Sequence, residues 1–314
     1  MRTARYKGKL NAFKEFFESL TRMPFLSNQM YSAILLIMKS AHPIFSIVTV
    51  TRNDLEGLKR TVQSVLDQTL PCELIIVDGD SEGSAVRDYL ESLSSKIHSI
   101  SWESRRDRGL YHAMNKGLAK VNGEFVLFLN SSDSLHNSRV LEDVKKLIVP
   151  TRASWAAGIA IRIQEDGVPV AVWEYLDHSE WGLALGFRTF CHQSVFYRTS
   201  LIKDFQYDED LLCADHLMNL KFYKEYPLTL MPLVTTYFQN GGISSKRNIR
   251  DTSRDLRTAR KRADSLILGN SVLDSIVFTL TLLLLKSNSA LWNWLRKILP
   301  KLVRVRFGAR IEGS

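Results

Sequence analysis

The chain has 314 residues, of which 45% are hydrophobic and 24% charged, values typical of a globular protein with one large domain or two ordinary ones. The net charge of +9 is concentrated in residues 1–43, 246–262 and 286–314, which together carry more positive charge than the whole chain. The rest of the chain is therefore acidic. A nucleic-acid-binding protein usually spreads positive charge over its folded domain, whereas basic flanks on an acidic body suit an anionic membrane surface. We expect an anionic membrane surface as a partner, and no nucleic acid.

The cysteines and the apolar runs indicate the compartment. Cys72, Cys191 and Cys213 are widely spaced and form no CxxC pair, which argues against a disulfide framework or zinc site and for a reducing compartment. No secretory signal is evident. The longest apolar run spans about 14 residues from Val272 if Asp274 is set aside, fewer than the ~20 that a spanning helix needs. The sequence predicts a cytoplasmic protein that is peripheral on the inner face of the cell membrane.

Residues 1–43 form a basic lead-in that we expect to be helical. Phe13, Phe16 and Phe17 fall at helical spacing with lysines and an arginine around them. Such a helix could lie on a membrane surface or pack on the body through its phenylalanine face.

From residue 45 the pattern alternates between strands and helices, which predicts a doubly wound, mostly parallel α/β sheet. A strand at 45–50 precedes a helix that Asn53 and Glu56 would open as a capping box. The strand at 125–129 is apolar throughout, as in a strand buried on both faces. The other expected elements of this half are strands at 73–77 and 97–102 and helices around 84–93 and 110–121.

Polar side chains follow three of these strands. They are Thr49 and Thr51 at the first, Asp78 and Asp80 at the second, and Asp133 at the fourth. Because parallel strands present their carboxyl ends at one edge of a sheet, we expect a single crevice. The chain has neither G-x-G-x-x-G after its first strand nor a P-loop, so dinucleotide and P-loop sites lose support. Carboxylates without a glycine phosphate loop suit a nucleotide whose diphosphate is neutralised by a metal.

Residues 45–133 resemble the nucleotide-sugar half of the family 2 glycosyltransferases, and most closely the branch that builds bacterial surface polysaccharides. The resemblance covers roughly a third of the chain in several ordered motifs. It implies a GT-A-like α/β fold with an acceptor-side half and a basic helical C-terminal tail. The matching stretches are residues 46–53, 63–69, 73–81, 107–117 and 123–133.

The resemblance also implies roles for residues of the donor half. Thr49, Thr51 and Asp78 would hold the nucleobase and ribose of the donor, and Asp107 and Arg108 would lie near the base and phosphates. Asp80 would add a further substrate contact in the turn after the second strand. On their residue types alone, Asp78 and Asp80 could equally be turn residues.

The tip at residues 130–133 would form the motif for the donor diphosphate and a divalent metal, Mg²⁺ or Mn²⁺. Asp133 would be the metal ligand, and Asn130 and Ser132 would contact the substrate. Many relatives have acidic residues at the positions of Asn130 and Ser132, so this chain departs from the common pattern and weaker metal binding is expected. A plainer role for Asp133 is to cap a following helix.

The second half contains the expected acceptor side. Strands at 155–163 and 168–173 flank the turn at 165–167, which reads as a hairpin. His192 and Gln193 lie in a stretch similar to the His-Gln-Ser of family members, which implies contact with the acceptor or the diphosphate.

Asp215 stands at the start of an amphipathic helix, where the family carries its catalytic acidic residue. Its plain alternative is N-capping of that helix. The attacking sugar hydroxyl must lose a proton, which a positioned carboxylate can accept as general base. We predict Asp215 in this role, with His216 as the alternative base and Asp210 less favoured; His216 would also contact substrate.

The last part combines a strand or strand pair at 228–238, a glycine loop at 240–245 and a basic helix at 248–268. The loop resembles one in relatives and could close over the donor phosphates. The tail joins the apolar stretch at 272–285 to Trp292, Trp294 and a basic run, a combination typical of membrane-surface attachment. Packing on the domain or a dimer interface would be the alternative.

The sequence thus predicts a metal-dependent inverting glycosyltransferase of hexosyltransferase type. It would use a nucleotide-sugar donor and a saccharide or lipid-linked acceptor in surface polysaccharide synthesis. Two alternatives stay open, a nucleotidyltransferase and a membrane-associated scaffold with a degenerate nucleotide-sugar site. The expected organisation is a lead-in at 1–43, a catalytic domain at 44–245 with halves at 44–134 and 135–245, and a basic helical tail at 246–314.

Overall fold

The structure is a computed structural model of the whole chain. It describes residues 43–94, 99–164, 166–173, 180–184, 189–240, 249–266 and 269–286. The expected lead-in up to residue 42, the glycine loop at 241–245 and the tail after residue 286 lie outside the described residues.

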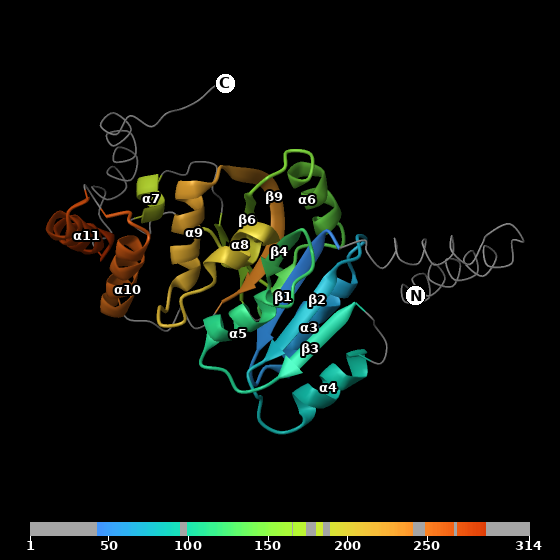
Figure 1. Cartoon of the computed structure of the whole chain (residues 1–314). Helices are drawn as coiled ribbons and strands as arrows, with labels where there is room; N and C mark the ends of the chain where they lie inside the picture. The colour runs from blue at the N-terminus through green and yellow to red at the C-terminus, as the bar shows by residue number, and fades with distance from the viewer. Residues whose placement is uncertain are drawn as a thin grey trace, which may run out of the picture. The chain divides into compact units, whose positions relative to one another are not determined.

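Four parallel strands form the first half of the sheet, in the order β3-β2-β1-β4 (Figure 1). Every residue of β1 and β4 is buried, which explains their continuous apolar runs because helices cover both faces of a parallel sheet. The predicted strands of this half are confirmed, although the third begins at residue 100 rather than 97. Their bounds are β1 Phe45–Thr51, β2 Glu73–Asp78, β3 Ile100–Ser104 and β4 Phe125–Phe128.

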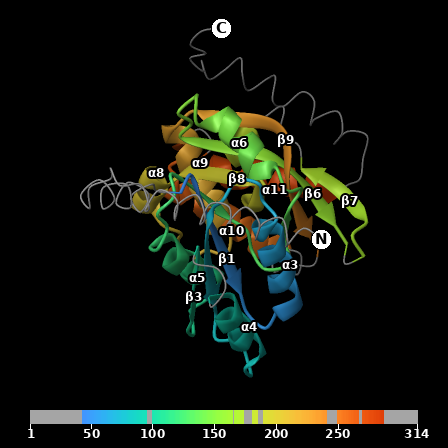
Figure 2. The ribbon, with the colours of Figure 1, turned by 90° about the vertical axis from the view of Figure 1, so that its right-hand side faces the viewer.

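Five more strands extend the sheet beyond β4 into a mixed second half. β8 pairs antiparallel with β4 and with β6, β9 lies parallel to β6, and β5 closes the edge beside β9. β7 pairs with β6 as the predicted hairpin, which is visible in Figure 2. The bounds are β5 Ser134–Leu135, β6 Trp155–Ile163, β7 Pro169–Trp173, β8 Val195–Arg198 and β9 Leu228–Gln239.

Helices cover both faces of the sheet, as the alternation of buried side chains along β1 requires. Val48 and Val50 belong to a buried cluster that includes residues of α5, α8, α9 and α10, whereas Phe45 and Ile47 belong to a second cluster with residues of α3, α4 and α6. The first group is α5 Leu110–Leu118, α8 Thr199–Phe205, α9 Ala214–Glu225 and α10 Ile249–Arg262. The second group is α3 Leu55–Leu66, α4 Ala85–Ser94 and α6 Val140–Ile148; the short α7 Glu180–Ala184 and η1 His192–Ser194 complete the second half.

The start of α3 differs from the prediction. Asp54 is the N-cap and accepts a hydrogen bond from the Gly57 N–H at 3.0 Å. Asn53 instead adopts a φ of 55° and its side chain accepts the Glu82 N–H at 2.8 Å. The predicted capping box of Asn53 and Glu56 is therefore wrong, because Asn53 is used to connect β1 to the turn after β2.

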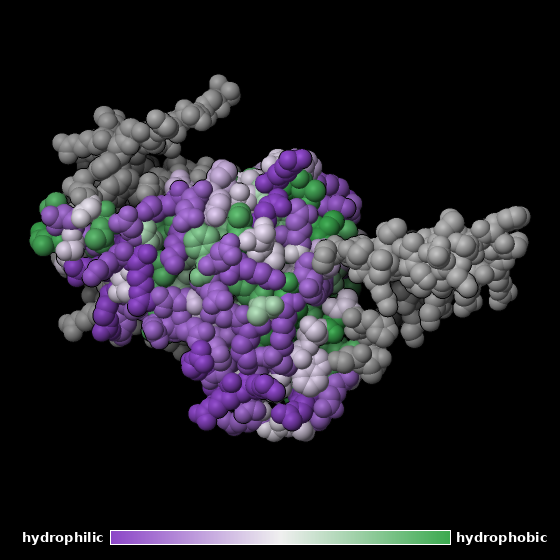
Figure 3. Space-filling model, in the orientation of Figure 1, coloured by the Kyte–Doolittle hydropathy of each residue, from purple (hydrophilic) through white to green (hydrophobic). Residues whose placement is uncertain are grey.

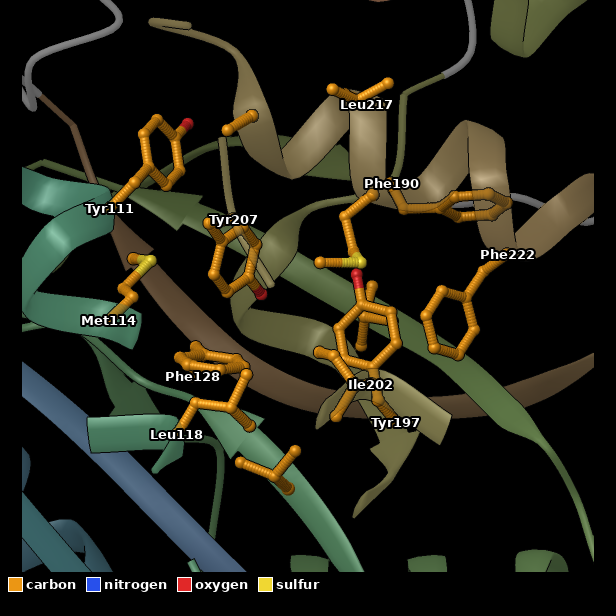
Figure 4. Packing of buried hydrophobic residues seen from close by; sticks show 14 of the residues in the cluster. Tyr111, Met114, Leu118, Phe128, Phe190, Tyr197, Ile202, Tyr207, Leu217 and Phe222 are labelled. Atoms are coloured by element: carbon orange, nitrogen blue, oxygen red, sulfur yellow. The ribbon is translucent and has the colours of Figure 1, made fainter. Parts of the chain in front are cut away.

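An aromatic cluster on one face of the sheet joins its two halves (Figure 4). Phe128 of β4 lies edge-on to Tyr207, with ring centroids 5.1 Å apart, and Tyr207 stacks on Tyr111 of α5 at 5.6 Å. Tyr197 of β8 meets Phe222 of α9 at 5.0 Å. Aromatic contacts of this kind add roughly 0.5–1.5 kcal/mol each beyond their buried area. The two halves of the sheet therefore share one core.

The predicted basic and apolar helices at the end of the described chain are observed as α10 and as α11 Ser271–Lys286. Asp274, which interrupts the apolar run of α11, is fully buried. It accepts two hydrogen bonds of 2.8 Å from Arg260 of α10, which is also fully buried. Within the described part of the chain, no helix is both long and apolar enough to cross a bilayer.

Candidate active site

The carboxyl ends of β1, β2 and β4 lie side by side, as expected. Thr51 is paired with Asp78, and the Gly79 N–H donates to the Thr51 carbonyl at 2.9 Å. On the other side of β1, the Ser131 N–H donates to the Val50 carbonyl at 3.1 Å. The polar segments that follow the three strands therefore form one edge.

Thr49 and Thr51 are both buried, with exposed fractions of 0% and 7%. Neither hydroxyl has a hydrogen-bond partner among the described residues. Because buried polar groups are nearly always paired, such groups need an explanation, and an absent ligand or water is one.

Asp78 is also buried and shapes the turn after β2. Its carboxylate accepts hydrogen bonds from the Ser81 hydroxyl at 2.5 Å and from the Ser104 hydroxyl at 2.8 Å. Asp80 is exposed, in the left-handed region with a φ of 65°. The turn chemistry recognised in the sequence is therefore present at both residues, while Asp78 stays at the strand end expected for donor contact.

Asp107 and Arg108 lie in the loop that leads into α5. A Cβ on Gly79 would come within 2.6 Å of Asp107 Oδ2, so the loop lies directly over the end of β2. The exposed Arg108 donates to Glu209 at 3.1 Å, and the Asn115 amide donates to the same carboxylate at 3.2 Å. Glu209 thus joins the donor-side loop to the acceptor-side half.

The tip after β4 is held by α3. The Thr61 hydroxyl donates to the Asp133 carbonyl at 2.7 Å. The hydroxyls of Ser131 and Ser132 donate to Asp54 Oδ2 at 2.5 and 2.8 Å. Burial raises the pKa of Asp54, but these bonds and the Gly57 N–H outweigh it and leave the pKa below its ordinary value. Asp54 is therefore an ionised carboxylate that faces the tip.

Asp133 is 3% exposed and faces the interior. Its carboxylate accepts the Gln239 N–H of β9 at 2.9 Å and a hydrogen bond from the Gln193 side chain. Burial raises the pKa of Asp133 to about 7 in spite of these bonds. It does not cap α6, whose N-cap is Arg139, so the capping alternative is excluded.

The fold brings η1 between Asp133 of the tip and Asp215 of α9. His192 is buried, stacks on Phe128 at 5.2 Å and lies 3.3 Å from the Tyr207 hydroxyl through Nε2. Burial lowers the pKa of His192, while the charge of Asp215 opposes this shift. Gln193 thus donates a hydrogen bond to Asp133, while the charge of Asp215 partly offsets the lowering of the pKa of the neighbouring His192 by burial.

Asp215 lies in the first turn of α9, at the position expected for the base. The N-cap is Cys213, so Asp215 does not cap the helix. Its carboxylate instead accepts the Tyr111 hydroxyl at 2.7 Å. The carboxylate is partly exposed and is fixed by a side chain from the donor half. Such a group can accept a proton from a substrate that lies over the strand ends.

His216 and Asp210 fit the base role less well. His216 is 4% exposed, and burial lowers its pKa to about 4, which makes it a weak base. Neither of its ring nitrogens has a partner among the described residues. Asp210 is exposed, on the turn before α9.

The tip offers oxygen donors suited to a hard divalent cation. They are the Asp54 carboxylate, the serine hydroxyls and the Asn130 Oδ1, which is buried and without a hydrogen-bond partner. Mg²⁺ and Mn²⁺ prefer such ligands. Among the described residues, no three His, Cys, Asp or Glu side chains gather as a metal-binding group. The oxygen atoms of the tip and of Asp54 are thus the groups at this edge that could hold such a cation.

A parallel β3-β2-β1-β4 half with polar strand ends, extended by a mixed second half, is the architecture of the GT-A fold. The fold matches Staphylococcus aureus TarS 1-349 in complex with UDP-GlcNAc, with a TM-score of 0.55 and 20% identity over 68% of this chain and 65% of that chain. It also matches the mannosyltransferase PcManGT of Pyrobaculum calidifontis in complex with GDP-Man and Mn²⁺, with a TM-score of 0.52 and 11% identity over 85% of this chain and 81% of that chain.

The sequence comparisons give the family. The profile of Glycosyl transferase family 2 matches residues 46–196. An uncharacterized glycosyltransferase of Mycobacterium tuberculosis is 30% identical over 68% of this chain and 82% of its own length. The Bacillus subtilis glycosyltransferase TuaG, named for teichuronic acid biosynthesis, is 31% identical over 42% of this chain and 53% of its own length. The chain belongs to glycosyl transferase family 2 and is a glycosyltransferase.

The sequence did not indicate three residues that contact the predicted site residues. They are Asp54, which contacts Ser132; Tyr111, which contacts Asp215; and Glu209, which contacts Arg108. Because the sequence assigned the N-cap of α3 to Asn53, it predicted no role for Asp54. Tyr111 contacts Asp215 across 104 positions of sequence, and Glu209 contacts Arg108 across 101. No local sequence pattern indicates such pairs. The signal available for Asp54 was its position as the last polar residue before the helix.

Proposed function

We propose that the protein is a metal-dependent inverting glycosyltransferase. It moves a sugar from a nucleotide-diphosphate sugar to a saccharide or lipid-linked acceptor in bacterial surface polysaccharide synthesis. The observation that carries this proposal is the Asp215 carboxylate, held by Tyr111 of the donor half at the start of an acceptor-side helix. The TarS structure with bound UDP-GlcNAc and the PcManGT structure with bound GDP-Man support a nucleotide-sugar donor. The name of TuaG supports the polysaccharide pathway.

The donor lies across the strand ends in this proposal. Thr49, Thr51 and Asp78 hold the base and ribose, and the unpartnered threonine hydroxyls are available for such contacts. Asp107 and Arg108, on the loop over β2, lie beside the base and phosphates. Asp80 and His216 keep their proposed substrate contacts at the rim and at α9.

The diphosphate lies at the tip, near Asn130 and Ser132, with Asp133 as the proposed metal ligand. A bound Mg²⁺ or Mn²⁺ would supply positive charge that stabilises the departing diphosphate. The Asp133 carboxylate also connects the tip to β9 and η1 through its hydrogen bonds. In this proposal His192 and Gln193 lie between the bound donor and the acceptor.

Asp215 removes the proton from the acceptor hydroxyl as its oxygen attacks the anomeric carbon. The new carbon–oxygen bond forms opposite the bond to the diphosphate, which leaves with its electron pair in a single displacement. The configuration at the anomeric carbon is therefore inverted. Tyr111 orients the carboxylate, so that proton transfer needs no reorganisation of the helix.

The membrane proposal is supported by the described surface of α11. Val272, Leu273 and Ile276 of α11 are exposed by 63%, 40% and 50%. Figure 3 shows hydrophobic surface in the region of α11. Exposed arginines of the neighbouring α10, Arg254 and Arg257, supply positive charge. An apolar face beside basic residues is typical of an interfacial helix, which supports peripheral attachment to the inner face of the membrane.

Calorimetry with a panel of nucleotide sugars, with and without Mn²⁺, tests the donor assignment, and transfer to a membrane extract tests turnover. Saturable donor binding with transfer is expected. Tight binding without turnover would favour the membrane scaffold, and binding of free nucleoside triphosphate with pyrophosphate release would favour the nucleotidyltransferase. Sedimentation with vesicles of anionic lipid tests attachment, and a Val272→Glu, Ile276→Glu variant is expected to lose it.

A further inference from the structure

The tip has a single carboxylate in its own sequence, and the fold uses that carboxylate internally. Asp133 is 3% exposed and accepts hydrogen bonds from the Gln239 N–H and the Gln193 side chain. These bonds hold β9 and η1 against β4. The other side chains of the tip, Asn130, Ser131 and Ser132, are neutral, so Asp133 is the one charged group that the tip itself contributes.

A second carboxylate reaches the tip from α3. Asp54 Oδ2 accepts the Ser131 hydroxyl at 2.5 Å and the Ser132 hydroxyl at 2.8 Å, while Oδ1 accepts the Gly57 N–H at 3.0 Å. An N-cap needs only the last of these bonds. The contacts to the two serines attach the charge to the tip, 77 and 78 positions away in sequence.

The surroundings of Asp54 are built to keep this carboxylate against the tip. A Cβ on Gly57 would lie 2.0 Å from Asp54 Oδ2 and 2.2 Å from the Ser132 hydroxyl, so only glycine leaves room for the contact. Within the tip itself, the Asn130 Oδ1 is buried and has no hydrogen-bond partner among the described residues. Buried oxygens without partners point to an absent donor or cation.

We propose that Asp54 supplies the second carboxylate of the metal and diphosphate site, so that the charge absent from Ser132 is delivered from the facing helix. This inference rests on the proposed function, because it concerns the cation that accompanies the donor diphosphate. Asp54 holds the cation together with the oxygens of the tip. The chain thus divides the site between two elements, β4 and α3.

The test removes the charge of Asp54 and then places a carboxylate at position 132, whose serine contacts Asp54 in the unaltered protein. Asp54→Asn keeps a capping side chain, since asparagine and aspartate cap helices equally well, so α3 should remain intact. Ser132→Asp is compatible with the left-handed φ of 76° at this position, which aspartate tolerates better than most residues. Asp67→Asn is the matched control, because Asp67 is exposed at the other end of the same helix.

Binding of Mn²⁺ to the full chain is measured by electron paramagnetic resonance, alone and with UDP or GDP, and nucleotide binding is measured by calorimetry. We expect Asp54→Asn to weaken Mn²⁺ binding by about 10–100-fold, Asp67→Asn to leave it unchanged, and the double variant Asp54→Asn, Ser132→Asp to restore most of it. Circular dichroism and Tm verify that each variant is folded.

Unchanged Mn²⁺ affinity in folded Asp54→Asn would overturn the inference and reduce Asp54 to a cap. Nucleotide binding with no Mn²⁺ binding in the unaltered protein would also overturn it, while the donor assignment stands. Mn²⁺ binding that depends on Asp54 without binding of any nucleotide sugar would support the inference and contradict the proposed function.

Discussion

The Tyr111 hydroxyl donates a hydrogen bond of 2.7 Å to the Asp215 carboxylate, and this bond connects the helix after the donor loop to the first turn of α9. Tyr111 is buried among Tyr207 and other aromatic side chains, so its position is fixed by the core. The candidate base is therefore oriented by a side chain of α5, although it belongs to α9.

Asp215→Asn should abolish transfer, with a loss of about 10²–10⁴-fold in kcat, because the amide cannot accept the proton of the attacking hydroxyl. Asparagine retains an oxygen that can accept the Tyr111 hydrogen bond, so donor affinity by calorimetry should not change. Tyr111→Phe is the companion variant, with a smaller loss of kcat. Full transfer by Asp215→Asn would exclude Asp215 as the base.

Glu209→Gln should raise the KM for the donor several-fold with little change in kcat. Glu209 anchors Arg108 at 3.1 Å and Asn115 at 3.2 Å, and loss of its charge frees the loop that bears Asp107 and Arg108. Steady-state kinetics over a range of donor concentration provide the measurement. Glu225→Gln, on the last turn of α9, is a control. A several-fold fall in kcat for Glu209→Gln, with the KM for the donor unaltered, would argue against a role for this contact in donor binding.

Arg260→Met should destabilise the protein by about 3–5 kcal/mol, because it leaves the fully buried Asp274 without its bidentate partner. Urea unfolding followed by circular dichroism gives the free energy. The double variant Arg260→Met, Asp274→Leu removes both charges and should recover much of the loss. If the single and double variants were equally unstable, packing rather than the unpaired charge would be responsible.

His216→Leu should change the dependence of stability on pH. Burial lowers the pKa of His216 to about 4, and neighbouring charges act in opposite senses, with Asp215 raising and Arg260 lowering it. The neutral ring is favoured in the folded state, so the stability from this group is present above pH 6.5 and is lost as pH falls through about 4. The contribution is about 3 kcal/mol for a shift from 6.5 to about 4.

The measurement is the difference in unfolding free energy between the unaltered protein and His216→Leu, taken from pH 7 to pH 4. This difference should decrease by about that amount as the pH falls. The raised pKa of Asp133 acts in the opposite direction, since the stability from that group is lost as pH rises toward about 7. A comparison of the two proteins cancels that effect. A difference independent of pH would mean that His216 is not held neutral.

The strands, the order of elements and the shared edge formed by the strand ends could be predicted because they follow from local periodicity. The continuous run at β4 predicts burial on both faces, and the polar residues after β1, β2 and β4 predict a shared edge. The partners of those residues could not be predicted. The Asp133 carboxylate accepts the N–H of Gln239 in β9, which lies 106 positions later in the sequence. That pairing exists only after the second half has folded, so the sequence could not predict the direction in which Asp133 points. The same holds for Asp274, which looks like an interruption of an apolar helix until Arg260 is placed beside it.

The buried pair of Arg260 and Asp274 also fixes the rotation of α11 about its own axis. Asp274 and Phe278, one turn apart, point inward to Arg260, whose guanidinium lies 4.4 Å from the Phe278 ring centroid. Val272, Leu273 and Ile276 consequently point away from the body. This arrangement inverts the usual amphipathic order of a water-soluble helix, with a charge inside and aliphatic side chains outside. Among the described side chains of α11, a single buried carboxylate thus determines which side of the helix is exposed.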